Sequence, residues 1–98
     1  MASLYDALAT CTTVAEMQNL LKDVLSAKEL AQAEVRWKIA EHMLDTGCSQ
    51  RAARQMFGAS QDQVKRITMC LGRRNSGYRK AHRQLWLRAN PGFDVIRS

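Results

Sequence analysis

Apolar residues recur every three or four positions along most of this chain, which is the spacing that lets an α-helix bury one face. No stretch alternates between apolar and polar residues with the β-branched side chains that strands favour. The pattern therefore predicts an all-α fold of about six helices, within residues 3–11, 12–25 and 26–47 and over residues 50–57, 61–71 and 78–89.

The first three predicted helices share a start signal, a hydroxyl side chain followed three positions later by a carboxylate. Such a pair can form a capping box, in which each side chain accepts a hydrogen bond from the other residue's backbone N–H. The pairs are Ser3 with Asp6, Thr13 with Glu16, and Ser26 with Glu29. Gly47 suits the end of the third helix, because glycine adopts the left-handed backbone conformation at little steric cost.

The chain has 98 residues, which leaves room for one small domain. Its three N-terminal helices carry long apolar stripes, more than one small monomer is expected to bury. We therefore expect a homodimer with part of its core between subunits. The predicted domain covers residues 1–89, with dimerisation and core helices (1–47), a helix pair (49–71) and a C-terminal helix (78–89), before a tail (90–98).

Residues 49–71 hold two short helical patterns around a single glycine, Gly58. Ser49 and Ser60 are the expected N-caps. The apolar residues expected to face inward are Ala53, Phe57, Val64, Ile67 and Leu71. Two short helices joined by a turn of three or four residues containing glycine describe a helix-turn-helix. An ordinary helical hairpin with basic exposed faces is the alternative interpretation.

The second helix of this motif begins with polar side chains that are short enough to reach base edges in the major groove of DNA. The expected base contacts are Gln61, Asp62, Gln63 and Lys65. One position departs from the usual pattern. Arg54 stands where the two helices approach closely and where a small residue is usual.

Charge separates the two halves of the chain. Residues 1–50 carry four Lys/Arg against seven Asp/Glu, whereas residues 51–98 carry eleven against two. Basic surface of this strength favours a polyanion as partner, most often nucleic acid. The turn and helix after residue 71 hold further expected phosphate contacts, Arg73, Arg74, Arg79 and Lys80, although a solvated terminal helix is the alternative.

Other classes of function find little support in the sequence. The three cysteines and two histidines share no spacing typical of a metal site, and no carboxylate pair or Cys/His constellation typical of an enzyme is present. No run of about twenty apolar residues predicts a membrane span, and no signal peptide is visible. We expect a cytoplasmic, nucleoid-associated protein with reduced cysteines, no metal and no cofactor.

Several short motifs, taken in order, make the chain similar to the Trp repressor-related family, of the YerC/YecD type. The resemblance covers roughly residues 3–86. It rests on Leu4-Tyr5-Asp6-Ala7-Leu8, the helix start at Leu25–Ser26, Arg36-Trp37, Gly47, Gly58-Ala59-Ser60, Arg66, Cys70-Leu71 and Gly77-Tyr78-Arg79. The resemblance implies an all-helical, intertwined homodimer that binds operator DNA.

The resemblance also implies roles for individual residues. The phosphate-contacting positions of the family fall on Gln50, Arg51 and Arg54, and its base-contacting positions fall on Gln61, Asp62, Gln63 and Lys65. Arg54 then fits, because Trp repressor is similar in carrying a lysine there. Asp62 is a departure: phosphate repels it, and we expect it to select bases by accepting a hydrogen bond from cytosine.

The tryptophan site of the family is only partly matched. Arg36 and Arg66 correspond to its two arginines and Ser26 to its threonine, but Ile67 replaces the glycine against which the indole lies. A branched side chain is expected to fill this vestigial ligand pocket, so we expect no tryptophan corepressor. The two arginines also suit ion pairs between helices, for example with Glu34 or Asp62.

The leading hypothesis is a bacterial or phage transcription regulator, repressor-like, that binds double-stranded DNA sequence-specifically as a homodimer. One alternative is a protein-interaction adaptor on the same scaffold. Its protein partner would bind the C-terminal tail through Trp86, Phe93, Val95 and Ile96. A second alternative is the DNA-contacting module of a transposase or replication system.

Overall fold

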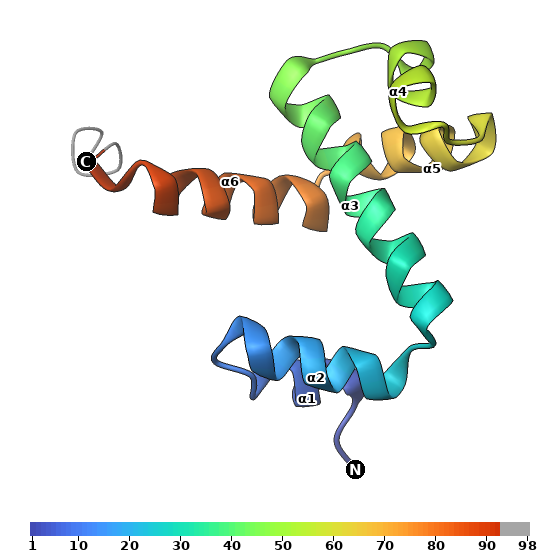
Figure 1. Ribbon diagram of the computed structural model, residues 1–98. Helices are drawn as coiled ribbons and strands as arrows, with labels where there is room; N and C mark the ends of the chain where they lie inside the picture. The colour runs from blue at the N-terminus through green and yellow to red at the C-terminus, as the bar shows by residue number, and fades with distance from the viewer. Residues whose placement is uncertain (93–98) are drawn as a thin grey trace. The chain divides into compact units, whose positions relative to one another are not determined.

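The computed structural model describes residues 1–92, which form helices and their connections, with no strand among them (Figure 1). In chain order the helices are α1 (Leu4–Ala9), α2 (Val14–Val24), α3 (Ala27–Thr46), α4 (Gln50–Phe57), α5 (Gln61–Leu71) and α6 (Gly77–Ala89). The prediction of an all-α fold with about six helices is confirmed. Nowhere between residues 1 and 92 does a helix combine the length and apolar content that crossing a membrane requires.

Two helix starts carry the predicted capping boxes. Ser3 Oγ accepts the backbone N–H of Asp6 at 3.1 Å, and the Asp6 carboxylate accepts the backbone N–H of Ser3 at 2.8 Å. Ser26 and Glu29 exchange the same two bonds, at 3.1 and 3.0 Å. In both pairs the backbone N–H of the serine, followed by the serine hydroxyl, donates to the carboxylate and lowers the pKa of the carboxyl group, because both bonds favour its ionised form.

The start of α2 differs in one respect. Thr13 Oγ1 accepts the backbone N–H of Glu16 at 3.1 Å, as predicted. The Glu16 carboxylate, however, accepts the backbone N–H of Thr12 at 3.2 Å, one residue earlier than a capping box requires. The N–H of Glu16 is therefore capped as predicted, whereas the carboxylate accepts from Thr12 in place of the N-cap residue Thr13.

Glycine and serine define the ends of the later helices. Gly47 follows α3 with a φ of 66°, and its N–H donates to the carbonyl oxygen of Met43 at 2.8 Å. The last helix begins at Gly77, one residue before the predicted start, because Ser76 Oγ accepts the N–H of Arg79. Ser76 is itself buried, with 4% of its surface exposed.

The chain divides into two compact units, with the boundary between Glu34 and Val35 inside α3. The first unit holds α1, α2 and the start of α3, and none of residues 1–34 is buried. Its exposed large apolar side chains are Met1, Leu4, Tyr5, Val14, Met17 and Val24. The leucines at positions 8, 20, 21, 25 and 30 are half-buried, so the apolar stripes of these helices are only partly buried. The predicted organisation into one domain over residues 1–89 and a tail stays a prediction.

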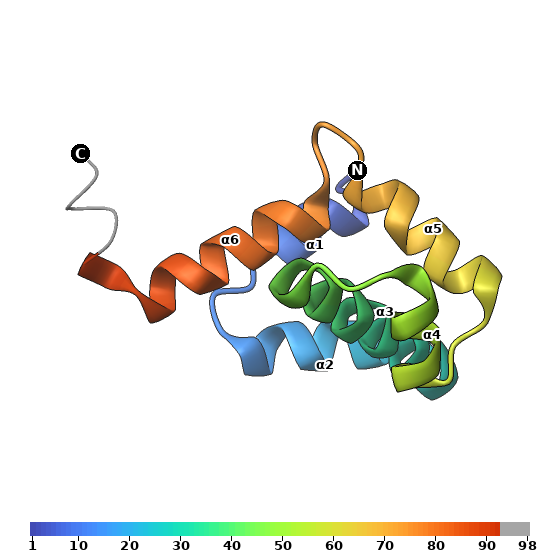
Figure 2. The ribbon, with the colours of Figure 1, turned by 90° about the horizontal axis from the view of Figure 1, so that it is seen from above.

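The second unit contains the buried core. Its members come from α3, α4 and α5, and they are Ile39, Ala40, Ala53, Val64, Ile67 and Leu71. The inward positions predicted for α5 are therefore confirmed, and each large apolar side chain stabilises the unit by about 2 kcal/mol. Figure 2 shows α4 and α5 next to α3, which contributes Ile39 and Ala40 to the core.

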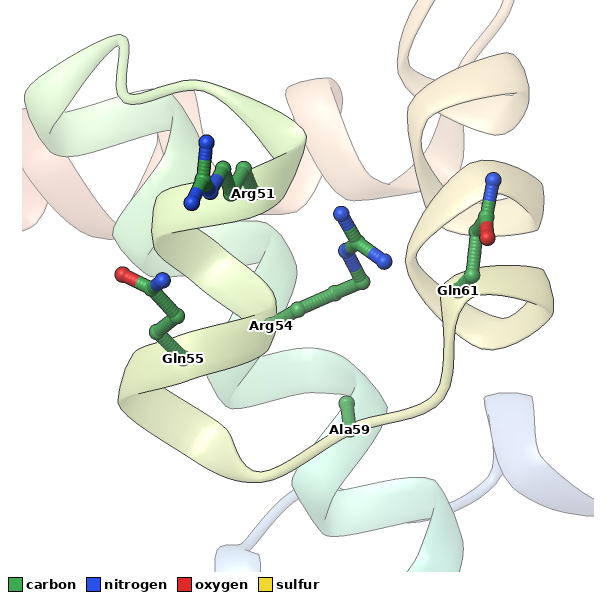
Figure 3. Close-up of a pocket in the computed structure, with 5 residues that line it drawn as sticks. All are labelled: Arg51, Arg54, Gln55, Ala59 and Gln61. Carbon is green, nitrogen blue, oxygen red and sulfur yellow. The ribbon is translucent and has the colours of Figure 1, made fainter.

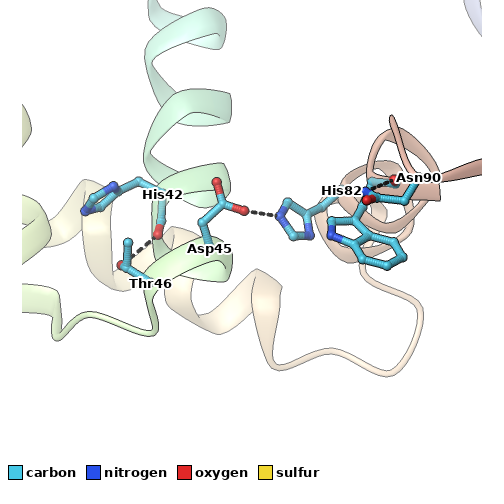
Figure 4. A network of polar contacts seen from close by, with 6 residues as sticks. His42, Asp45, Thr46, His82 and Asn90 are labelled. Atoms are coloured by element: carbon cyan, nitrogen blue, oxygen red, sulfur yellow. Dashed lines mark hydrogen bonds and ion pairs between the residues drawn. The ribbon is translucent and has the colours of Figure 1, made fainter. Parts of the chain in front are cut away.

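Two contacts join α6 to α3 within the second unit. The rings of Trp37 and Tyr78 stack, with centroids 6.3 Å apart and an interplanar angle of 25°. His82 Nε2 lies 2.6 Å from Asp45 Oδ1 (Figure 4). Tyr78 and His82 are four residues apart, so they occupy one face of α6. This face positions the last helix against the core.

The turn between α4 and α5 provides a test of the backbone geometry. Gly58 has a φ of 63°, and a β-carbon built there would meet no atom within 4 Å. Gly58→Ala should therefore lower the free energy of unfolding by about 1 kcal/mol through backbone strain alone. Urea denaturation measures this change.

Gly77→Ala is the matched control for this substitution. A β-carbon at Gly77 also meets no atom within 4 Å, but Gly77 lies in α6 without a positive φ. Alanine there should leave stability unchanged or raise it by up to about 1 kcal/mol. Equal destabilisation by the two substitutions would contradict the assigned turn geometry.

The capping box of α3 predicts a pH dependence. The pKa of Glu29 is lower in the folded protein than in the unfolded chain. Its contribution to stability is thus present above the unfolded pKa and is lost as pH falls through the folded pKa. Urea unfolding at several pH values should show Glu29→Ala less stable than the unsubstituted chain near neutral pH, with the difference shrinking in acid.

Glu29→Gln is the control for this titration. Its amide oxygen still accepts the N–H of Ser26, but the side chain gains no proton as the pH falls. The stability of this variant should therefore change less over the acid range than that of the unsubstituted chain. A gap between Glu29→Ala and the unsubstituted chain that stays constant with pH would count against the capping interaction.

Candidate nucleic-acid interface

Serine caps set the starts of both helices of the α4–α5 pair. Ser49 Oγ accepts the N–H of Ala52 at 3.1 Å, and Ser60 Oγ accepts the N–H of Gln63 at 3.2 Å. The left-handed Gly58 ends α4, and the turn of residues 58–60 leads directly into α5. Both predicted caps and the predicted glycine turn are confirmed, so the local chemistry of residues 49–60 determines where the two helices begin and end.

The first turns of α5 expose a polar face. Val64 is fully buried and Ile67 is 2% exposed, so the helix is held with this side toward the core. The candidate base-contacting residues Gln61, Asp62 and Lys65 are exposed, and Gln63 is half-buried. The structure thus brings all four together at the N-terminal end of one helix.

A pocket of about 280 Å³ lies between α4 and the start of α5 (Figure 3). It is lined by Arg51, Arg54, Gln55, Ala59 and Gln61. In Figure 3 the guanidinium of Arg54 extends from α4 toward the α5 side of the pocket. Two of the predicted phosphate contacts therefore share one pocket with a predicted base contact. Gln50, the third residue of that phosphate set, is exposed at the start of α4.

Arg54 has an unusual environment within this pocket. Its Nε atom is buried and has no hydrogen-bond partner within residues 1–92. The close approach of the helices is provided by the neighbouring Ala53, which is fully buried, while Arg54 stays half-buried at the edge. A buried charged donor without a partner is costly, and an anionic oxygen in the pocket would satisfy it.

The remaining predicted phosphate contacts lie beyond α5. Arg73 and Arg74 are exposed in the connection to α6, and Arg79 and Lys80 are exposed in its first turns. Arg79 has a second role, since its Nε donates to the carbonyl oxygen of Leu71 near the end of α5. These four residues form a basic group that is separate from the pocket at Arg54.

The residues assigned to a vestigial ligand pocket are distributed over both units. Ser26 belongs to the first unit, where it caps α3, while Arg36, Arg66 and Ile67 belong to the second. Ile67 is buried in the core cluster, and both arginines are exposed. The side chain of Ile67 therefore fills space within the hydrophobic core.

The proposed pairing of these arginines is not found. Within residues 1–92 the only ion pair joins His82 and Asp45, so neither Arg36 nor Arg66 pairs with Glu34 or Asp62. Both guanidinium groups are exposed, and water solvates them at little cost. The predicted inter-helix ion pairs of Arg36 and Arg66 are therefore absent within residues 1–92.

Sequence reasoning missed the contact between His82 and Asp45. The two residues are 37 positions apart, and no local pattern links them. Two local hydrogen bonds lie nearby: Thr46 Oγ1 donates to the carbonyl oxygen of His42, and Asn90 Nδ2 donates to that of Trp86 (Figure 4). The network positions helix ends, and nothing in it resembles a catalytic arrangement.

The tail that motivated an adaptor role is only partly described. Trp86 lies on α6 and is 42% exposed. Phe93, Val95 and Ile96 lie outside the described residues. Across residues 1–92, no group of three or more His, Cys, Asp or Glu side chains could hold a metal ion, and the three cysteines are unpaired and half-buried.

A family model described as Trp repressor protein matches residues 1–86. Neither the curated proteins nor the solved structures give a match.

The unpaired Nε predicts opposite effects of Arg54→Met on stability and on binding. Methionine keeps much of the aliphatic chain and removes the buried donor, so unfolding free energy should stay the same or rise by up to about 1 kcal/mol. Affinity for duplex DNA should fall about tenfold, because a charged hydrogen bond is lost. Urea denaturation and titration with a labelled duplex measure the two effects.

Arg51→Met is the control, because Arg51 lines the same pocket but is exposed. It should weaken DNA binding without any gain in stability. A loss of more than about 2 kcal/mol of stability in Arg54→Met would instead identify Arg54 as a residue that holds the two helices together.

Proposed function

The chain belongs to the Trp repressor family, and on this premise we propose that it is a repressor-like transcription regulator that binds DNA sequence-specifically as a homodimer. The family consists of DNA-binding regulators rather than enzymes, which defines the general function of the chain. One observation carries the proposal further: the polar first turns of α5 are exposed while Val64 and Ile67 hold the helix against the core.

The exposed residues of α5 have the chemistry for base contacts in the major groove. The amides of Gln61 and Gln63 can donate to and accept from adenine, and the ammonium of Lys65 can donate to guanine. Asp62 can accept from the amino group of cytosine, and it disfavours positions that would bring phosphate close. Together these side chains would select the sequence.

The basic residues around α5 supply affinity that does not depend on sequence. Arg51 and Arg54, with Gln50, lie on α4 beside the start of α5, where phosphates of the same groove would pass. Neutralising phosphates releases counterions, so this part of the binding should weaken steeply as salt rises. The division of roles is thus base selection by α5 and positioning by α4.

A homodimer explains the apolar surface of the first unit. None of residues 1–34 is buried, although α1 and α2 carry large apolar side chains. A second copy of the chain would cover these stripes and make one shared core. Two recognition helices related by a two-fold axis would then read half-sites about 34 Å apart, one turn of DNA.

We further propose that the regulator needs no tryptophan. Ile67, at the position where the family has a glycine, contributes its side chain to the core cluster. Opening space for an indole there would remove a packed branched side chain, at a cost of several kcal/mol. DNA affinity should therefore be the same with and without added tryptophan.

The test of the proposal replaces Gln61 and Lys65 together by alanine. Each good base contact discriminates by about 1–3 kcal/mol, so affinity for a duplex selected from a random pool should fall about 10–100-fold or more. Affinity for a duplex of mixed sequence should fall only a few-fold, through the lost lysine charge. Titrations of both duplexes at one salt concentration compare the effects.

Arg73→Ala with Arg74→Ala is the matched control. Both residues are exposed and lie outside α5, so their loss should weaken binding to the two duplexes by similar factors. If the α5 variant behaves like this control, the base-contacting role of α5 is refuted.

A further inference from the structure

A groove of about 660 Å³ lies along α6 and the turn before it, apart from the α4–α5 pocket. Four cations line it, Arg74, Arg79, Lys80 and Arg83. The amide side chains of Asn75 and Gln84 stand among them. This combination of cations and neutral donors is the set that proteins use to contact phosphate and sugar.

Charge is denser here than on the α4–α5 pair. Residues 72–89 carry six arginines and lysines and no acidic residue, a formal charge of +6. Residues 50–71 carry four arginines and lysines with Asp62, a formal charge of +3. Within residues 1–92 none of the four lining cations takes part in an ion pair. Among the described residues, the groove therefore presents a strong positive potential that no ion pair neutralises.

The groove is supported by a fixed helix face. Tyr78 and His82 hold one side of α6 through Trp37 and Asp45. Lys80, Arg83 and Gln84 are spaced at three and four residues, so they share another face of α6. Arg79 is anchored separately, through its bond to the carbonyl of Leu71. A rigid helix that presents aligned cations is preorganised for a regular polyanion.

The lining residues also indicate which polyanion fits. No aromatic side chain lines the groove, and single-stranded nucleic acids are bound largely by stacking their bases on aromatic rings. Phosphate contact without stacking suits the backbone of a duplex, whose bases stay paired and stacked.

The position of the groove distinguishes it from the proposed recognition site. The base-contacting residues occupy the first turns of α5, while the groove begins after Leu71, its last residue. At 1.5 Å per residue, the six to ten residues between the base-contacting positions and Leu71 span about 9–15 Å, the length of roughly three to four base pairs. Figures 1 and 2 both show α6 running away from α4 beyond the C-terminal end of α5.

We propose that this groove is a second DNA site, which binds backbone phosphates of the duplex outside the base pairs that α5 contacts, whatever their sequence. This inference rests on the proposed DNA-binding function. The bound duplex is then longer than the helix-turn-helix alone requires, and the flanking contacts provide much of the salt-dependent affinity.

The test compares two double variants of the full chain with equal loss of charge. Lys80→Gln with Arg83→Gln removes two groove cations, and Lys28→Gln with Lys38→Gln removes two exposed cations of α3. Dissociation constants are measured over a range of salt on a mixed-sequence duplex of about four helical turns. Circular dichroism confirms equal helix content in both variants.

The groove variant should show a logarithmic salt dependence that is shallower by about 2, because each lost phosphate contact reduces the slope by about 0.9. The α3 variant should keep the slope of the unsubstituted chain. Lengthening the duplex from about two turns to four should raise the affinity of the unsubstituted chain and of the α3 variant, but not that of the groove variant.

Two outcomes would overturn the inference, and they differ from failure of the proposed function. Equal slopes for the groove variant and the unsubstituted chain would mean that the groove faces solvent, lipid or protein rather than DNA. Equal losses in both variants would mean that only net charge matters. If the unsubstituted chain itself binds no duplex DNA at low salt, the proposed function fails, and this inference fails with it.

Discussion

The burial of Val64 and Ile67 in the small core of the second unit is the constraint on which the proposed interface depends. Both side chains lie on one face of α5, and Ala53 of α4 allows the two helices to approach closely. Because that face points toward the core, the polar residues on the opposite face of α5 point toward solvent. The same burial places the side chain of Ile67 in the core. One packing arrangement therefore underlies both the proposed DNA recognition and the proposed independence from a corepressor.

The two units of the chain differ in how many residues they bury. The second unit has buried residues from three helices, which keep the α4–α5 pair in a defined geometry. The first unit buries none of its own residues, and in the proposed homodimer its exposed apolar side chains would contact the second copy. A regulator of two-fold symmetric sites needs a rigid base-contacting helix and a contact between two copies. The first keeps the side chains aligned with the bases, and the second sets the distance between the two base-contacting helices.

Local chemistry made most of the helix boundaries predictable from the sequence. Ser49, Gly58 and Ser60 act on backbone groups within three residues, so their roles follow from the sequence nearby. The predicted start of α6 is one residue late, because Ser76 lacks the acidic partner that marks the caps of the first three helices. Two features were not predicted: the contact of His82 with Asp45 and the burial of the Arg54 Nε without a hydrogen-bond partner. Both depend on how the helices pack rather than on any local pattern.

The most direct measurement is selection of bound duplexes from a random pool, at about 150 mM salt, where long-range attraction is partly screened. A dimer that reads bases through α5 should enrich a two-fold symmetric motif, with half-site centres about one helical turn apart. Enrichment of no sequence, with binding that disappears as salt rises, would contradict the account. The basic residues of the second half would then form a general polyanion-binding surface rather than the interface of a sequence-specific regulator.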